Sequence, residues 1–409
     1  MTKLYLKKGR EESLLRFHPW VFSGAVGGIE GPDPAEGDAV AVYSSRKAFL
    51  GWGHYQVGSI AVRMLSFADD MPAGGPDVDF WSRRLQACLE ARRAMGLATG
   101  ADTDCYRLVH GEGDRLPGLI VDWYDGVCVL QAHSVGMFLA RGDIAAALGR
   151  IYGPALQGVY DKSSGTAPFK AGLDLADGYL YRSDSSEALC PRTVHENGHK
   201  FLVDWETGQK TGFFLDQRDN RALVERYARG RRVLNLFCYT GGFSVYALSG
   251  GALSVDSVDS SAKAIELARR NVELNRAAGP DPGAEVRHRA LCTDAIDFVK
   301  TAPGGAYDLI IVDPPAFAKH RGALSNALRA YQRLNAAAIA AVAPGGLVFT
   351  FSCSQVVDRE AFSLAVFSAA AETGRHVRIL DRLCQGADHP VSIYHPEGSY
   401  LKGLVLYVE

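Results

Sequence analysis

The residues best suited to chemistry follow hydrophobic runs in the second half of the chain. At 349–354 the stretch "FTFSCS" puts Cys353 between two serines, where a run typical of a buried strand ends. A buried thiol can simply be a small packing residue. At the carboxyl end of a strand in an open α/β sheet, however, a side chain lies where ligands bind. A thiolate in that position could act as a nucleophile, so Cys353 is a candidate for covalent catalysis.

A glycine turn and an acidic residue follow two earlier runs. The stretch "VLNLFCYTGGFSVYAL" (233–248) predicts a strand, a turn and a helix, and glycines in such a turn let the backbone approach a ligand. It has neither the G-x-G-x-x-G order of dinucleotide-binding turns nor the G-K-[ST] ending of a phosphate-binding loop. Asp259 ends the next run, "LSVDSVD", 17 residues after Gly242. A carboxylate there can accept hydrogen bonds from ribose hydroxyls.

Two more acidic residues occupy equivalent positions. Asp294 precedes the helical stretch "AIDFVK", and Asp313 ends "LIIVD" and begins the sequence Asp-Pro-Pro. The prolines cannot continue a sheet, so the chain must leave it at this point. Asp259 or Asp294 alone could be a helix N-cap, and a Gly-Gly turn alone could be structural. The ordered set is more specific than any of its members.

The elements that would hold these residues alternate regularly. From residue 193 to 409, strand-like and helix-like runs alternate, which predicts a parallel sheet with helices on both faces. At its start, 199–214 ("HKFLVDWETGQKTGFF") predicts a β-hairpin. Residues 1–72 contain short β-like runs between turn residues and predict a small β domain. Residues 73–192 mix helical and strand patterns and predict a central α+β domain.

Composition is ordinary for a globular protein. The chain has 409 residues and a formal net charge of −2, so overall charge gives no support to nucleic-acid binding, although residues 1–28 carry a local excess of basic side chains. None of the 8 cysteines forms a C-x-x-C pair, which argues against a zinc ribbon, and no metal site is expected. No stretch has the length of a membrane span or the pattern of a signal peptide. We therefore expect a cytoplasmic protein with no membrane partner.

Taken together, the motifs resemble those of class I S-adenosylmethionine-dependent methyltransferases, which have a Rossmann-like α/β fold. The match extends over nearly the whole chain. "LKKGREESLLRFHPWVFSGAV" (6–26) looks like the opening of a PUA domain, a small RNA-binding β barrel, and 107–126 resembles the central domain of the same enzymes. "LDQRDNR", "NLFCYTGGFSV", "DPPAFAK", "FSCS", "DHP" and "SYLKG" complete the similarity. It is to the bacterial PUA-domain-containing RNA (cytosine-5) methyltransferases, whose characterised members act on large-subunit (23S) ribosomal RNA.

The resemblance implies S-adenosyl-L-methionine as cofactor and places its contacts. Asp259 and Ser260 would hold the ribose, and Asp294 and Ala295 would lie near the adenine. The positions implied for the glycine turn and the methyl end are Gln217, Phe237, Cys238, Tyr239, Thr240, Gly241, Gly242, Phe243, Ser244, Asp313 and Pro314. The last strand of such a fold, here "LKGLVLYVE", would run antiparallel to its neighbours.

The chemistry of cytosine C5 gives Cys353 and Asp313 their expected roles. Cytosine C5 is a poor nucleophile, and attack of a thiolate on C6 would make it reactive. Asp313 could hold the cytosine or assist proton transfer. Many RNA cytosine-5 enzymes carry a second cysteine after the D-P motif, but this chain has Pro315 there, so the group that removes the C5 proton is left open. Cys238 is interpreted as a packing residue whose backbone meets the cofactor, and Cys384 could approach the substrate but is not expected to take part in the chemistry.

The implied substrate is RNA, and basic side chains would contact its phosphates. The candidates are Lys7, Lys8, Arg10, Arg218 and Lys319. A homodimer would be compatible with the family. Two other functions stay open: an amino-group RNA methyltransferase that uses the D-P-P motif, and a non-catalytic RNA-binding protein of ribosome assembly.

Overall fold

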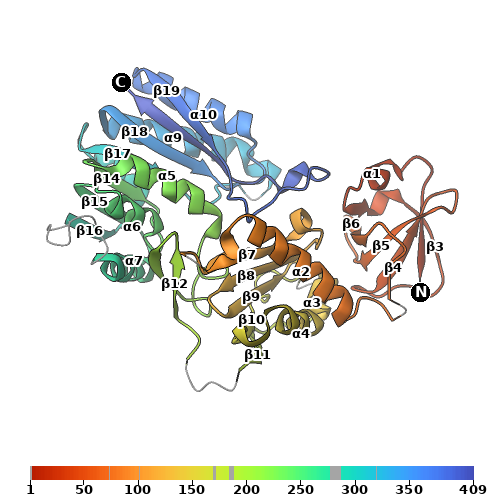
Figure 1. Cartoon of the computed structure of the whole chain (residues 1–409). Coiled ribbons are helices and arrows are strands. Elements are labelled where there is room, and N and C mark those ends of the chain that lie inside the picture. The colour runs from red at the N-terminus through yellow and green to blue at the C-terminus, as the bar shows by residue number, and fades with distance from the viewer. Residues whose placement is uncertain are drawn as a thin grey trace. The chain divides into compact units, whose positions relative to one another are not determined.

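The computed structural model describes residues 2–72, 74–100, 102–168, 172–183, 188–276, 287–318 and 320–409 (Figure 1). The chain forms two compact units. The first comprises Met1–Val194, Val203–Leu215 and Ala387–Gly398, and the second His195–Leu202, Asp216–Gly386 and Ser399–Glu409. The chain thus returns to the first unit near its end. This division does not test the three-domain boundaries predicted above, which stay predictions.

A six-stranded sheet occupies the N-terminal part of the first unit, in the order β2-β6-β5-β4-β1-β3. Its pairs are antiparallel except for β1 and β4, which are parallel. Its strands are β1 (Lys3–Leu6), β2 (Trp20–Phe22), β3 (Val26–Glu30), β4 (Ala39–Tyr43), β5 (Phe49–Tyr55) and β6 (Ile60–Ser66), with the short helix α1 (Glu12–Leu15) between the first two. Apolar side chains that alternate along these strands form a core of their own.

A five-stranded sheet with helices follows in the same unit, in the order β11-β10-β9-β8-β7. Its strands are β7 (Cys105–His110), β8 (Leu119–Tyr124), β9 (Val127–Ala132), β10 (Gly158–Asp161) and β11 (Gly178–Arg182). Its helices are α2 (Val78–Ala94), α3 (Val135–Leu139) and α4 (Arg141–Tyr152). Asp125 and Gly126 join β8 to β9 with positive φ angles, the backbone of a tight two-residue turn.

The second unit contains a seven-stranded sheet in the order β16-β15-β14-β17-β18-β20-β19 (Figure 1). The first five strands in this order are parallel, and β20 is antiparallel to both its neighbours, as predicted for "LKGLVLYVE". The bounds are β14 (Arg232–Leu236), β15 (Ser254–Asp259), β16 (Arg287–Cys292), β17 (Tyr307–Val312), β18 (Val342–Ser352), β19 (Val377–Leu383) and β20 (Lys402–Val408).

Helices cover both faces of this sheet, as the alternating sequence pattern predicts. Neighbouring residues of β14 point to opposite faces: Val233 packs with residues of α5 and α6, and Leu234 with residues of α8, α9 and α10. The bounds are α5 (Arg218–Ala228), α6 (Gly242–Ser249), α7 (Ala262–Asn275), α8 (Ala295–Thr301), α9 (Leu324–Ala341) and α10 (Arg359–Thr373). No described helix is long and apolar enough to cross a membrane.

The predicted hairpin at 199–214 differs from the structure. The two strands are β12 (Arg192–Glu196) and β13 (His199–Val203), which pair around Asn197 and Gly198. Both turn residues have positive φ, the backbone that an Asn-Gly pair adopts readily in a two-residue hairpin. The prediction missed this signal because it began the hairpin one strand too late.

Candidate active site

The turn after β14 is shaped by residues in the left-handed region. Phe237, Tyr239 and Gly241 have φ angles of +57°, +47° and +79°. A Cβ on Gly241 would lie 3.0 Å from the Cβ of Ala268 on α7. Glycine is therefore required at 241 by both the backbone conformation and the close approach of the helix. The turn leads into the N-terminus of α6, as predicted for a ligand-binding turn.

Asp259, at the end of β15, holds this turn in place. Its Oδ2 accepts a hydrogen bond from the backbone N–H of Tyr239 at 3.0 Å, and its Oδ1 accepts one from Ser261 N–H at 2.9 Å. The N-cap of α7 is Ser261, whose hydroxyl accepts from Ala264 N–H. Asp259 is therefore not the N-cap of α7. Its carboxylate instead links the end of β15 to the turn that follows β14.

Several side chains of the turn point into the protein. The Ser244 hydroxyl is buried, accepts a hydrogen bond from Asn235 Nδ2 at 2.8 Å and lies 2.6 Å from Ser257 Oγ. Burial is the main cause that raises the pKa of the Cys238 thiol, and the nearby Asp259 carboxylate raises it further. Cys238 is thereby kept neutral, in agreement with its interpretation as a packing residue. The turn would meet a ligand mainly through its backbone.

The acidic residue after β16 has a local structural role. Asp294 is the N-cap of α8, because its Oδ1 accepts hydrogen bonds from the backbone N–H groups of Ile296 and Asp297 at 2.8 and 2.9 Å. The side chain of Asp294 is exposed, and Ala295 beside it is buried. The cap uses one carboxylate oxygen and fixes the position of the other at the carboxyl edge of the sheet.

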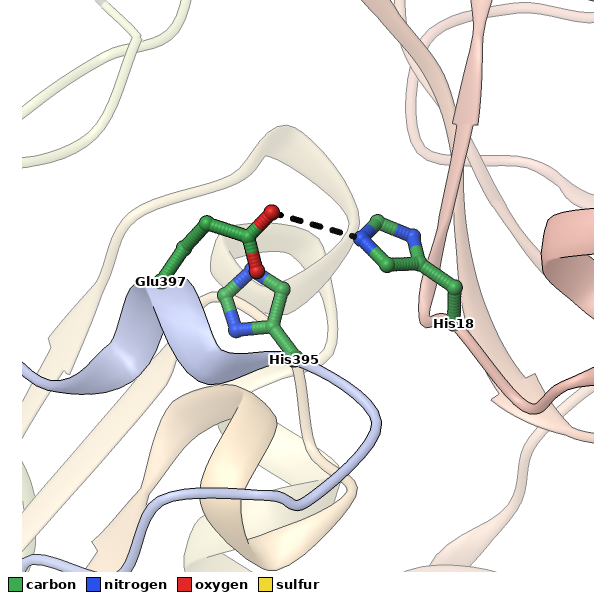
Figure 2. Close-up of side chains that lie close together, drawn as sticks. All are labelled: His18, His395 and Glu397. Atoms are coloured by element: carbon green, nitrogen blue, oxygen red, sulfur yellow. Dashed lines mark ion pairs between the residues drawn. The ribbon is translucent and has the colours of Figure 1, made fainter.

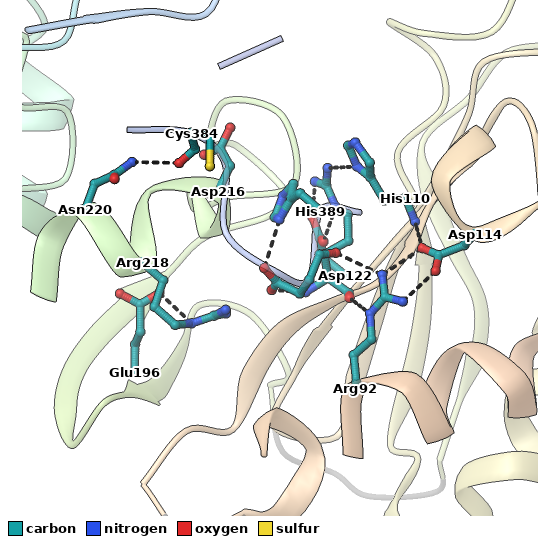
Figure 3. Close-up of polar contacts among 12 residues, drawn as sticks. Arg92, His110, Asp114, Asp122, Glu196, Asp216, Arg218, Asn220, Cys384 and His389 are labelled. Atoms are coloured by element: carbon teal, nitrogen blue, oxygen red, sulfur yellow. Dashed lines mark hydrogen bonds and ion pairs between the residues drawn. The ribbon is translucent and has the colours of Figure 1, made fainter. Parts of the chain in front are cut away.

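Asp313 belongs to a chain of amide hydrogen bonds at the end of β17. Its Oδ2 accepts from Gln217 Nε2 at 3.0 Å. The Oε1 of the buried Gln217 accepts in turn from Asn220 Nδ2 at 2.6 Å, and that same nitrogen donates to the backbone oxygen of Cys384 at 3.1 Å (Figure 3). Gln217 therefore orients Asp313, a contact that sequence alone did not reveal.

Cys353 lies immediately beyond β18, the strand next to β17. Val312 is paired with Thr350, so the chain segments that carry Asp313 and Cys353 leave the sheet side by side. Cys353 Sγ lies 4.0 Å from the backbone oxygen of Pro314, and the side chain is half-buried. The thiol and the Asp-Pro-Pro segment thus meet at one edge of the sheet, as predicted.

Lys402 was not predicted as part of this site. It is buried at the start of β20, opposite Ser352, and its Nζ donates a hydrogen bond to the backbone oxygen of Ser354. Burial lowers the pKa of Lys402 to about 8. A lysine next to the long apolar run "GLVLYV" was the sequence signal that could have identified it.

The basic residues predicted to contact RNA have different environments. Lys7, Lys8 and Arg10 are exposed. Arg218, in contrast, is buried and its Nε lies 3.5 Å from the Glu196 carboxylate (Figure 3). Its guanidinium is engaged inside the second unit, so we leave Arg218 out of the phosphate contacts proposed below. Lys319 lies outside the described residues.

A histidine-rich cluster in the first unit has metal-ligand residue types. His18, His395 and Glu397 bring one ligand atom each within 4.8 Å of one another (Figure 2). The backbone N–H of Trp20 donates to His18 Nδ1 at 3.2 Å, the shorter of two contacts between these groups. The other ring nitrogen, Nε2, lies 3.9 Å from the Glu397 carboxylate. The contact drawn in Figure 2 is therefore that of a His18–Glu397 pair.

Comparison with known proteins agrees with this site. The S-adenosylmethionine-dependent methyltransferase family matches residues 164–390, and a PUA-like domain matches residues 4–67. A ribosomal RNA large subunit methyltransferase I from Aeromonas hydrophila subsp. hydrophila is 41% identical over 411 residues, covering 99% of each chain. The protein of that name from Escherichia coli O139:H28 is 39% identical over 410 residues, covering 100% of this chain and 99% of the relative.

The chain belongs to this methyltransferase family. Among solved structures, SMU.776, assigned as a methyltransferase and complexed with SAH, has a TM-score of 0.82 at 25% identity, with 100% of both chains covered. The methyltransferase therefore has the predicted class I fold and a PUA-like N-terminal domain, and it uses S-adenosylmethionine.

The residues present fit this cofactor. Asp259 can hold ribose hydroxyls, and it fixes the positive-φ turn at Phe237, Tyr239 and Gly241 beside it. Asp313 directly follows the adjoining strand β17. When bound, the cofactor supplies an electrophilic methyl group, and the residues of this edge would hold and orient it.

Proposed function

We propose that this methyltransferase methylates C5 of a cytosine in large-subunit (23S) ribosomal RNA, with Cys353 as the nucleophile. The observation that carries the proposal is the position of the Cys353 thiol 4.0 Å from the Pro314 backbone oxygen, beside the segment that carries Asp313. The name shared by the relatives that match this chain over its full length supports the choice of substrate.

The chemistry explains why a thiol is needed at this edge. The Cys353 thiolate attacks C6, the C6–S bond forms, and the electron pair of the C5–C6 double bond makes C5 nucleophilic. C5 then accepts the methyl group, a base removes the C5 proton, and the C6–S bond breaks with its electron pair returning to sulfur. The target base must leave any stack to meet the thiol.

The other residues of the edge have supporting roles in this proposal. Asp313, oriented by Gln217, would accept a hydrogen bond from the cytosine amino group. The cofactor would contact the turn 237–244, Asp259 with Ser260, and Asp294 with Ala295. Lys7, Lys8 and Arg10 of the PUA-like domain would contact phosphates, so binding of RNA should weaken as salt rises.

Transfer of a labelled methyl group to a 23S ribosomal RNA transcript tests the role of Cys353. We expect Cys353→Ala to lose roughly 10³-fold or more in rate, the scale of losing a nucleophile. Cys190→Ala, which removes a half-buried thiol of the first unit, is the matched control and should keep the wild-type rate. Unchanged transfer by Cys353→Ala would contradict the covalent mechanism and favour methylation of an exocyclic amine.

The target atom requires a second measurement. RNA that carries 5-fluorocytosine cannot release a C5 proton, so it should trap the wild-type enzyme as an adduct stable to denaturation. Cys353→Ala should form none. Bisulfite mapping of ribosomal RNA from cells lacking the protein should then show one cytosine that has lost protection, and protection retained at every site would contradict the proposed substrate.

A further inference from the structure

Lys402 is placed beside the nucleophile by sheet register. Lys402 pairs with Ser352, the residue directly before Cys353. The Nζ of Lys402 donates to the backbone oxygen of Ser354, the residue directly after Cys353. Ser354 is fixed in turn, because its hydroxyl donates to the Ala318 backbone oxygen at 2.6 Å. The lysine thus holds the short segment that presents the thiol, and only 4% of its surface is exposed.

A buried ammonium needs a partner of opposite charge. Burial lowers the pKa of Lys402 to about 8, while an ionised Cys353 raises it; Arg359 lowers it and Asp358 raises it. Both of these charged residues are exposed, and the Asp358 carboxylate is engaged as the N-cap of α10. Tyr331, also near Cys353, supplies no anion, because burial raises its pKa to about 12. The ionised thiol is therefore the anion best placed to compensate the lysine.

We propose that the Lys402 ammonium is the counter-ion that stabilises Cys353 as a thiolate, and that Lys402 is a positioning residue for methyl transfer. Its part in methyl transfer rests on the function proposed above, whereas the ion pair itself does not. Attraction between the two groups is mutual, so the effect of the thiolate on the lysine implies an equal effect of the lysine on the thiol.

The step is a simple ionisation. The S–H bond of Cys353 breaks, its electron pair stays on sulfur, and the proton leaves to water while Lys402 keeps its three protons. When sulfur attacks C6 the negative charge passes to the base, and when the C6–S bond breaks the thiolate forms again next to the ammonium. The lysine thereby favours both the attacking and the leaving form of the sulfur.

Alkylation of the full-length protein by iodoacetamide tests the ion pair without RNA or cofactor. The rate at Cys353 is followed against pH by peptide mass spectrometry, and the exposed Cys292 serves as an internal reference. Lys402→Met should raise the midpoint of the Cys353 curve by about one pH unit or more, which makes alkylation at pH 7 about tenfold slower. Lys402→Arg should keep the wild-type midpoint. The exposed Lys300→Met, on α8, is the control.

A wild-type midpoint in Lys402→Met, or an equal shift in both Lys402 variants, would overturn the proposal. Thermal melts check that each variant is folded, and Lys402→Gln replaces the methionine variant if that one is not. Methyl transfer gives the functional arm: kcat of Lys402→Met should fall about tenfold at pH 7, recover near pH 9, and leave KM for the cofactor unchanged. If Cys353→Ala still transfers methyl while the alkylation midpoints differ, the proposed function fails and the ion pair stands.

Discussion

The methyltransferase buries cations in two very different ways. Arg92 of the first unit makes two hydrogen bonds to the Asp114 carboxylate, at 2.6 and 2.7 Å, and donates to the backbone oxygen of Asp388 (Figure 3). Burial lowers the pKa of Arg92, but the Asp114 hydrogen bonds and charge more than offset this. Burial also lowers the pKa of Lys402 in the second unit, and there the ionised Cys353 offsets only part of the lowering. A fully paired buried cation serves the fold, and an under-compensated one is available to a reacting group.

Breaking the paired cation should have the largest effect on stability. Arg92→Met leaves the Asp114 carboxylate buried without its partner, which should cost about 3–5 kcal/mol in the free energy of unfolding. Urea denaturation followed by circular dichroism measures the loss. The adjacent Arg93→Met removes an exposed pair with Glu90 and should cost less than about 0.5 kcal/mol. Equal losses in the two variants would contradict the contrast between paired and exposed cations.

The first unit also buries a neutral histidine, His54, whose contribution to stability depends on pH. Burial lowers the pKa of His54 to about 4, and its side chain packs against Gly136 and lies near the Trp81 ring. The unfolded chain binds a proton at about pH 6.5, so stability is fully present above that value and is lost as pH falls toward 4.

In the wild-type protein, the His54 contribution to this loss in the free energy of unfolding should be on the order of 3 kcal/mol between pH 6.5 and 4. His54→Gln, which cannot titrate, should be less stable at pH 7 but should show a flatter decline on acidification. Urea titrations at a series of pH values measure both slopes. A slope equal to that of the wild type would show that His54 is not responsible.

At the carboxyl edge of the seven-stranded sheet, removal of an acidic side chain should change cofactor binding more than folding. Asp259→Ala removes the acceptor of two backbone hydrogen bonds and the predicted ribose ligand. Hydrogen bonds to a charged group contribute roughly 1.5–3 kcal/mol, so the Kd for S-adenosylmethionine should rise about ten- to a hundredfold in calorimetry. Asp297→Ala, an exposed acidic residue on α8, should bind as the wild type does. Unchanged affinity in Asp259→Ala would remove it from the cofactor site.

The sequence predicted the second unit well because its signals are local. Asp259, Asp294, Asp313 and Cys353 each lie at or just after the end of a strand-like run. Their meeting requires only that parallel strands place their ends at one edge, and the sheet order confirms that they do. The same reasoning could not find Lys402, which reaches the backbone of Ser354, next to Cys353, only because β20 inserts between β18 and β19. That contact joins residues 48 positions apart and leaves no local pattern.

Partners far away in the sequence also set the environments of two segments that local patterns described incompletely. Arg218 resembles a solvated basic residue in sequence, but β12 brings Glu196 against it and buries both. The "DHP" stretch does lie in a loop, but its anchor is a distant one: Asp388 Oδ2 accepts a hydrogen bond from Arg107 N–H, 281 positions earlier, and holds the segment in the first unit. A single sequence records residue types and spacing, whereas such partners depend on how the whole chain packs.

The smallest expected effect separates backbone strain from close packing in the cofactor turn. Gly241 and Gly251 both have positive φ, +79° and +87°, so alanine should cost about 1 kcal/mol at either site. At 241 the added Cβ also meets Ala268 at 3.0 Å, while at 251 the nearest atom is 3.8 Å away. Gly241→Ala should therefore be less stable than Gly251→Ala by a further ~1 kcal/mol in urea denaturation.

Gly241→Ala alone should also weaken S-adenosylmethionine binding, because relief of the contact must move the turn that Asp259 holds. Equal affinities in the two variants would show that the turn supports α7 and is not shaped for the cofactor.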